Sequence, residues 1–226
     1  PNIVAAHDAR EVDGTAVLVT EYIDGLNVGS IIRRVGPLTI ADATRIACDV
    51  AAALGAINDA GLIHRDVKPS NIMVSRAGQV KLLDLGLARL QDTNGELQEH
   101  TATGQALGTV DYIAPEQINE GRDVDVRADI YALGCTLFRM LTGQPVFDDV
   151  RYATAFAKMT AHVQVKPSSL GDIADNIPAP LVGLVAEMLQ KDPALRPQTP
   201  HALVERLEPF TTGANLSALV EQASTC

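Results

Sequence analysis

The sequence has no tryptophan, and aromatic residues make up only 4% of its 226 residues. Its three cysteines, Cys48, Cys135 and Cys226, are widely separated and follow no Cys-x-x-Cys or Cys/His spacing, so they indicate neither a disulfide framework nor a zinc site. Basic residues are also scarce: 18 Lys and Arg stand against 28 Asp and Glu, and the net charge is −10. Because nucleic acids and anionic membranes attract basic surfaces, we expect no nucleic-acid partner. The widely spaced cysteines favour a reducing, cytoplasmic setting.

Long hydrophobic runs are missing as well. The two most apolar stretches, 43–57 and 128–141, contain charged residues and are shorter than the roughly 20 apolar residues that span a bilayer. No charged, apolar and small-residue leader opens the chain, which begins with Pro1 as a trimmed or partial sequence would. We therefore expect no membrane span within this chain, while an anchor of the complete protein outside it stays open.

What the sequence does contain is an ordinary globular mix, 46% hydrophobic and 20% charged, long enough for one large domain or two small ones. Extended runs at 3–6 and 15–22 flank Asp13-Gly14, which favours a hairpin turn. Thr39 and Asp42 resemble a capping box, and the Ala-rich stretch up to Gly61 predicts a helix over about 40–60. Short apolar runs predict a second hairpin, and helical periodicity recurs further on; these segments are 72–74 with 80–83, and then 125–142, 151–161, 180–190 and 200–208. The order predicts an α+β fold with a little β structure first and mostly helix after it.

A group of polar residues follows the predicted long helix. Asp66, Lys68 and Asn71 lie in one short segment, and Asp84 comes directly after the second predicted hairpin. Phosphoryl transfer to a hydroxyl needs a carboxylate that orients the nucleophile, a cation near the phosphate, and metal ions held on hard oxygen ligands. This spacing favours that chemistry.

The same residues carry a family resemblance. The sequence resembles the eukaryotic-type (Hanks-type) Ser/Thr protein kinases in their bacterial form, because residues 64–71 match H-R-D-x-K-P-x-N and residues 84–86 are a D-L-G version of D-F-G. Further motifs follow in the family's order: A-P-E at 114–116, D-x-x-x-x-G at 129–134 and K-D-P-x-x-R-P at 191–197. Several motifs in the right order are far more specific than any one of them. The resemblance implies a protein-kinase-like fold with a mostly α-helical large lobe and a two-strand remnant of the small lobe.

The resemblance also implies a division of the chain. Residues 1–24 would be the small-lobe remnant with two strands and the hinge, 25–212 the large lobe, and 213–226 a C-terminal tail. The glycine-rich loop, strand lysine and helix glutamate of the family would all precede the two strands, and the first lysine of the chain is Lys68. We therefore interpret the sequence as an N-terminally truncated catalytic domain and expect little or no activity from it alone.

Catalytic roles follow by resemblance, with ATP as the phosphoryl donor. Asp66 would accept or orient the proton of the substrate hydroxyl, and Lys68 would lie beside the transferring phosphate. Asn71 and Asp84 would hold Mg²⁺, with Mn²⁺ as an alternative ion. Thr109 would line the acceptor site, and together with Lys68 it indicates Ser/Thr rather than Tyr in protein substrates.

Nucleotide-binding and supporting roles follow in the same way. Backbone groups of Glu21 and Ile23 in the hinge would pair with adenine, and Met73 would lie under the base. Glu116 would form an ion pair with Arg196, and Asp129 would accept backbone N–H bonds from the catalytic loop. Arg65 and Arg89 would form a basic pocket for a phosphorylated loop residue, for which the candidates are Thr101 and Thr103. The alternative for these threonines is two solvated loop residues.

Two other functions stay open. A small-molecule phosphotransferase of related fold would share the Asp and Asn arrangement, although it ordinarily lacks the Lys68 pattern and the A-P-E segment. A pseudokinase or protein-binding scaffold would bind without catalysis, against which the intact Asp66, Lys68, Asn71 and Asp84 argue. If the chain is a kinase, its partners are protein substrates and other copies of itself, through self-association or autophosphorylation in trans.

Overall fold

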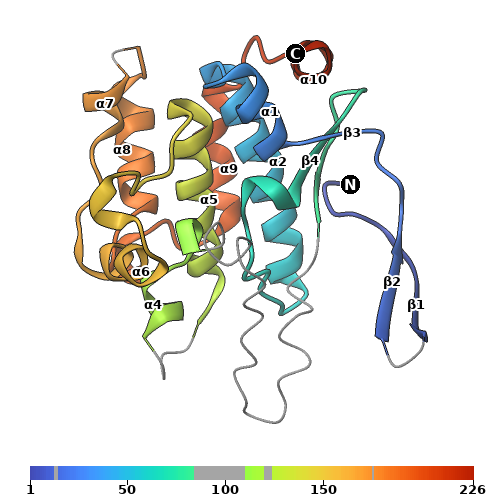
Figure 1. Ribbon diagram of the computed structural model, residues 1–226, viewed down its shortest axis with the longest axis horizontal. Helices are drawn as coiled ribbons and strands as arrows, with labels where there is room; N and C mark the ends of the chain where they lie inside the picture. Colours follow the sequence, from blue (N-terminus) through green and yellow to red (C-terminus); the bar gives the residue numbers. More distant parts are fainter. Residues whose placement is uncertain (13–14, 84–109, 120–123, 175) are drawn as a thin grey trace.

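The computed structural model describes residues 1–12, 15–83, 110–119, 124–174 and 176–226. Most of these residues belong to a body of helices, and two small β-sheets lie along one side of it (Figure 1). The fold is therefore of the α+β class, as the sequence predicts.

The first sheet is a hairpin of β1 (Ala6–Val12) and β2 (Thr15–Thr20), paired antiparallel with Val12 opposite Thr15. The expected first strand at 3–6 is wrong, because that segment pairs elsewhere: Val4 N–H donates to Leu82 O at 3.0 Å, and Leu82 N–H donates to Asn2 O at 2.8 Å. Every side chain of β1 is exposed, so no apolar alternation marks this strand in the sequence. The turn at 13–14 lies outside the described residues.

The second sheet has the order β3-β4-β5, formed by Gly25–Asn27, Ile72–Ser75 and Val80–Leu82. The predicted hairpin at 72–83 is confirmed, and both strand pairs are antiparallel. Gly25 is required for close pairing, since a Cβ atom there would lie 2.1 Å from the carbonyl oxygen of Val74. This sheet connects the hinge region to the segment that carries Asp66 and Asn71.

The predicted long helix is α2 (Ile40–Asp59), and its start has the expected capping geometry. Thr39 Oγ1 accepts a hydrogen bond from Asp42 N–H at 3.1 Å and donates to Asp42 Oδ2 at 2.7 Å. The chain leaves the helix through Gly61, whose φ of +74° is readily adopted only by glycine. A shorter helix that the sequence analysis missed, α1 (Val28–Val35), precedes it and is capped by Asn27.

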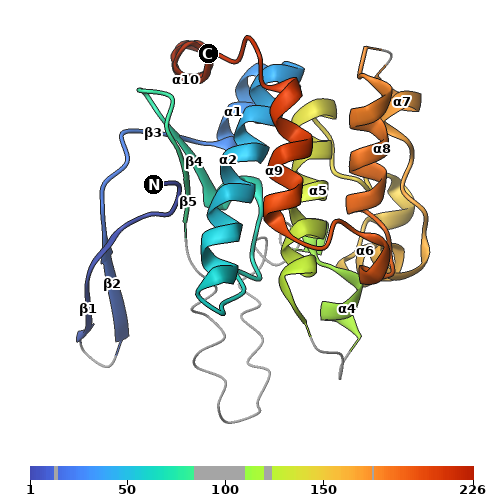
Figure 2. The ribbon, with the colours of Figure 1, turned by 180° about the vertical axis from the view of Figure 1, so that it is seen from behind.

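At the centre of the body lies α5 (Val126–Thr142), which is buried along almost its whole length. Gly134 allows α8 to pack closely, because a Cβ atom there would lie 2.9 Å from Met188 Cβ. Seen from behind, α9 lies beside α2 (Figure 2). The other helices of the described residues are α4 (Pro115–Ile118), α6 (Ala155–Gln164), α7 (Leu170–Ile173), α8 (Ala179–Met188), α9 (Pro200–Leu207) and α10 (Leu216–Thr225), with short 3-10 turns at Pro69–Asn71, Val110–Tyr112, Val150–Tyr152, Pro193–Leu195 and Glu208–Phe210.

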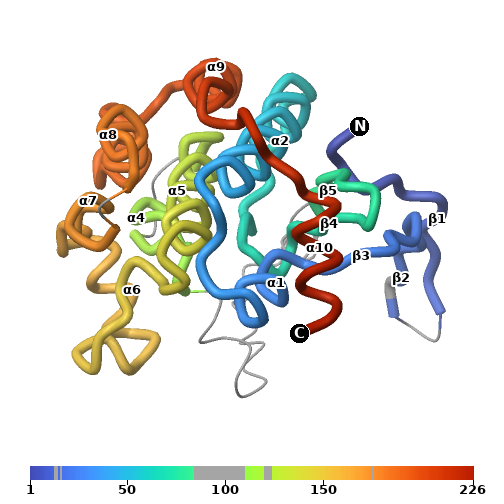
Figure 3. Tube along the Cα trace, turned by 90° about the horizontal axis from the view of Figure 1, so that it is seen from above, coloured from blue at the N-terminus to red at the C-terminus, as the bar shows by residue number. Residues whose placement is uncertain are grey.

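The C-terminal segment, expected as a tail, carries α10, which lies against α1 (Figure 3). Arg34 Nη1 donates to Ala223 O at 2.8 Å, and Asn215 N–H donates to Asp42 Oδ1 at 2.8 Å. The buried face of the helix consists of Leu216, Leu219, Val220 and Ala223. Throughout the described ranges, no helix combines the length and the apolar character needed to cross a bilayer.

Candidate active site

His64 anchors the loop between α2 and β4. Its buried ring has Nδ1 3.3 Å from Asp66 N and Nε2 2.8 Å from Leu83 O. Because the backbone N–H can only donate and the carbonyl can only accept, Nδ1 is the acceptor and Nε2 carries the proton. The imidazole therefore connects the backbone of Asp66 to the end of the β4–β5 hairpin.

The expected contact of Asp129 with the loop is present. His64 N–H donates to Asp129 Oδ2 at 2.8 Å, and Arg65 N–H donates to Oδ1 at 2.7 Å. Burial raises the pKa of this carboxyl group to about 6, although the two amide hydrogen bonds act in the opposite direction. Arg65 has a φ of +66°, which is unfavourable for a non-glycine residue, so these two bonds hold a strained backbone in place.

Asp66, Lys68 and Asn71 lie together, as their spacing predicts. Asp66 Oδ2 lies 2.8 Å from Lys68 Nζ and accepts a hydrogen bond from Asn71 Nδ2 at 2.8 Å; the same amide group donates to Asp66 O at 2.9 Å. Among the described residues, no hydrogen bond reaches Asp66 Oδ1. The side chain of Asp66 is therefore fixed through one oxygen and available through the other.

Asn71 fits the role of a metal ligand. Its NH₂ group is committed to Asp66, so its Oδ1 must point the other way, where Ser70 Oγ, at 3.3 Å, is its one hydrogen-bond partner among the described residues. A carbonyl oxygen is a hard ligand of the kind that Mg²⁺ takes. The second expected ligand, Asp84, lies outside the described residues, as do Arg89, Thr101, Thr103 and Thr109.

The hinge residues lie opposite the β4–β5 hairpin. Glu21 N–H donates to Ala5 O at 2.9 Å, while no hydrogen bond between described residues occupies the carbonyl of Glu21 or the N–H of Ile23. Met73 is half-buried on β4 and lies directly across from Lys81 on β5, so both side chains are on one face of the sheet. Since Lys81 reaches Glu21, that face is the one turned toward the hinge.

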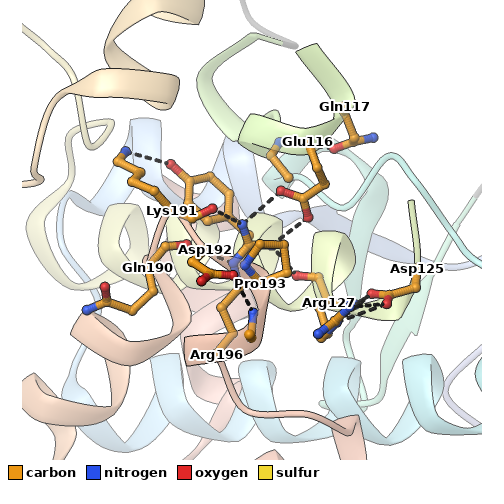
Figure 4. Close-up of polar contacts among 12 residues, drawn as sticks. Glu116, Gln117, Asp125, Arg127, Gln190, Lys191, Asp192, Pro193 and Arg196 are labelled. Atoms are coloured by element: carbon orange, nitrogen blue, oxygen red, sulfur yellow. Dashed lines mark hydrogen bonds and ion pairs between the residues drawn. The ribbon is translucent and has the colours of Figure 1, made fainter. Parts of the chain in front are cut away.

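Glu116 and Arg196 form a buried bidentate ion pair (Figure 4). Nη1 donates to Oε1 at 2.6 Å and Nη2 donates to Oε2 at 2.8 Å. The guanidinium group also donates to three backbone carbonyls, those of Gln190 at 2.8 Å, Arg127 at 2.8 Å and Lys191 at 3.1 Å. This pair joins α4 to the start of α5 and to the segment after α8.

A second buried polar cluster was not expected from the sequence. The hydroxyl of Tyr131 lies 2.8 Å from His162 Nδ1 and accepts from Lys191 Nζ at 3.3 Å. Burial lowers the pKa of His162 to about 3 and that of Lys191 to about 8. Lys191 belongs to a motif quoted above, but nothing in the sequence pairs it with α6; Lys81 was missed for the same reason.

Comparison with known proteins gives one consistent result. The family profile described as "Protein kinase domain" matches residues 1–207. The chain is 41% identical over 206 residues to "Probable serine/threonine-protein kinase PknB" of Corynebacterium glutamicum, which covers 88% of the chain and 31% of that protein. It is 35% identical over 222 residues to "Probable serine/threonine-protein kinase CE0033" of Corynebacterium efficiens, a match that covers 95% of the chain and 33% of that protein. It is 37% identical over 204 residues to "Serine/threonine-protein kinase PknB" of Mycobacterium tuberculosis, a match that covers 88% of the chain and 32% of that protein.

The chain thus spans about a third of the length of these relatives. Its α+β fold is that of a protein kinase with a reduced small lobe. The chain belongs to the protein kinase family and resembles its bacterial Ser/Thr members.

Proposed function

We propose that this protein transfers the γ-phosphoryl group of ATP to Ser and Thr hydroxyls of protein substrates. The observation that carries the proposal is the state of Asp66, whose Oδ2 is held by Lys68 and Asn71 while Oδ1 is left for a hydroxyl proton. A carboxylate held in this way can orient a hydroxyl toward the phosphate, and Lys68 can stabilise the charge on the transferring group. The names of the relatives, which are serine/threonine-protein kinases, agree with this reaction.

ATP and a divalent cation are the cofactors that the family uses in general. In this chain Asn71 Oδ1 would hold Mg²⁺ together with Asp84, and Mn²⁺ is the alternative. The bound ion would neutralise charge on the phosphate oxygens. The carbonyl of Glu21 and the N–H of Ile23 would pair with adenine, with Met73 beneath it. This work takes place where ATP is present, so we propose a cytoplasmic active site.

Substrate binding and control involve residues outside the described ranges, and they remain proposals on the sequence. Thr109 would line the acceptor site. Arg65, whose side chain is exposed, would pair with Arg89 to bind a phosphate on Thr101 or Thr103. Such a phosphate would come from autophosphorylation, in trans when two copies meet.

For the 226-residue chain by itself we propose a much lower activity. Its residues include no Gly-x-Gly-x-x-Gly before β1 and no lysine before Lys68, so two groups that hold the phosphates in this family are not among them. We propose that residues 1–24, 25–212 and 213–226 correspond to small-lobe strands with hinge, large lobe and C-terminal segment. We expect this chain alone to bind Mg-ATP weakly and to turn over negligibly.

The test uses the complete product of the gene that encodes this sequence, incubated with γ-labelled ATP, Mg²⁺, a generic protein substrate and a panel of small alcohols. We expect label on protein, and phosphoamino-acid analysis should find it on Ser and Thr. Label on small alcohols only would replace the proposal with a small-molecule phosphotransferase. No transfer to any acceptor would replace it with a binding scaffold. The 226-residue chain, assayed in parallel, should transfer almost nothing.

A further inference from the structure

The carboxylate of Glu21 makes contacts that its expected backbone role does not explain. Glu21 Oε1 accepts a hydrogen bond from Lys81 Nζ at 2.7 Å and another from Ala5 N–H at 2.8 Å. Lys81 Nζ also lies 3.5 Å from Ile3 O. The side chains are 28% and 18% exposed, so this ion pair is partly shielded from water. The hydrogen bond from Lys81, followed by that from Ala5, lowers the pKa of Glu21, which keeps the carboxylate charged.

These contacts connect three segments to one another: residues 2–5, the hinge at Glu21, and β5. Residues 2–4 pair with β5 through Val4 and Leu82, and Ala5 then bonds to Glu21 through both its carbonyl and its N–H. Lys81 provides the third connection, because it extends from β5 directly to the Glu21 carboxylate. Glu21 is therefore connected to β5 in two ways, directly by a charged contact with Lys81 and indirectly through the segment 2–5.

The position of Lys81 on the hairpin relates this attachment to Met73. Lys81 lies directly opposite Met73, and directly opposite residues of antiparallel strands point to the same face. The ion pair thus spans the gap between the backbone groups of Glu21 and Ile23 on one side and Met73 on the other. These are the groups that would contact the adenine ring from its edge and from one face.

We propose that the Glu21–Lys81 ion pair positions the adenine site, by fixing the hinge backbone at a set separation from Met73. The inference rests on the proposed function, because it assumes that adenine binds between these groups. Both residues are positioning residues, since Lys81 acts through Glu21 and Glu21 Oε1 is already bonded to Lys81 Nζ and to Ala5 N–H. Losing the pair should weaken ATP binding and leave the phosphoryl-transfer step unchanged.

A neighbouring ion pair serves as the matched control. Asp24, three residues after Glu21, lies 3.1 Å from Arg76 in the turn of the same hairpin. It joins the same two segments, but its side chains are 67% and 62% exposed and it lies at the turn, away from Met73. Solvent screens such a pair strongly, so its loss should matter little.

The experiment measures KM for ATP and kcat in the complete gene product. For Lys81→Met and Glu21→Gln we expect KM for ATP to rise about 3- to 10-fold while kcat stays within about twofold. The double variant should be no worse than either single variant, since both remove one interaction. Lys81→Arg should restore KM, and Arg76→Met should leave both constants unchanged.

Several results would overturn the inference. It fails if KM for ATP is unchanged in both single variants, if Arg76→Met raises KM as much as Lys81→Met does, or if kcat falls in parallel with the apparent affinity. If the wild-type protein transfers no phosphate, the proposed function fails instead, and titration with a fluorescent adenine nucleotide then tests the ion pair alone. Lys81→Met should weaken that binding, and equal affinity in both proteins would refute the positioning role.

Discussion

Replacing Arg196 by methionine tests whether the buried ion pair with Glu116 stabilises the helical body. The two side chains are 0% and 4% exposed, and the guanidinium group also donates to three backbone carbonyls. Methionine occupies similar space but donates nothing, so the variant would leave the Glu116 carboxylate without its cation in a buried site. The effect should therefore exceed that of an ordinary surface substitution.

The expected magnitude follows from what is left unpaired. Breaking a buried ion pair by removing one partner costs about 3–5 kcal/mol, most of it the penalty of the uncompensated charge. For a chain of this size, 1 kcal/mol corresponds to roughly 2–4 °C in melting temperature. We expect Arg196→Met to lower the free energy of unfolding by about 3–5 kcal/mol and the melting temperature by roughly 6–20 °C.

Urea denaturation followed by circular dichroism measures this loss, and a surface pair supplies the control. Arg206 and Glu187 also form a bidentate contact, at 2.5 and 2.9 Å, but their side chains are 42% and 46% exposed. Arg206→Met should therefore cost no more than about 1 kcal/mol. A loss below about 1 kcal/mol for Arg196→Met, or equal losses for the two variants, would refute the argument from burial.

Three further substitutions probe separate parts of the fold. Burial lowers the pKa of His162 to about 3 from 6.5, so the stability that depends on the neutral imidazole is complete above pH 6.5 and is lost as the pH falls toward 3. Between pH 7 and 5 the wild-type protein should therefore lose about 2 kcal/mol more unfolding free energy than His162→Gln, as measured by urea titrations at both pH values. Thr39→Ala removes the cap of α2 and should cost about 1 kcal/mol, whereas an unchanged urea midpoint would show that the cap is dispensable. Gly134→Ala should destabilise by about 1–3 kcal/mol because its Cβ would meet Met188, and a stabilised variant in thermal melts would contradict this packing.

Local signals in the sequence predicted the elements that depend on local interactions. The helix α2 has its capping pair, its Ala-rich body and its terminal glycine within one stretch, and the β4–β5 hairpin is closed by a turn of four residues. The cluster of Asp66, Lys68 and Asn71 was predictable because its members lie within six residues of one another. The Glu116–Arg196 contact spans 80 residues, and only the family resemblance indicated it.

What the sequence did not predict depends on pairing between distant segments. Residues 3–6 were expected to pair with 15–22, but the segment 2–4 pairs with β5 instead, and no local pattern favours one partner over the other. The docking of α10 on α1 depends on a buried face of four residues that could equally have stayed exposed. Lys81 is an ordinary strand residue until the register places it opposite Met73 and within reach of Glu21.

The most direct test of the central claim is the rate of phosphoryl transfer in a single turnover, measured for the complete gene product and its Asp66→Asn variant. If Asp66 Oδ1 receives the hydroxyl proton, the variant should be slower by about 10²- to 10⁴-fold while its affinity for ATP is unchanged. A variant that transfers phosphate within about threefold of the wild-type rate would contradict the assignment of Asp66 and the proposed function that rests on it.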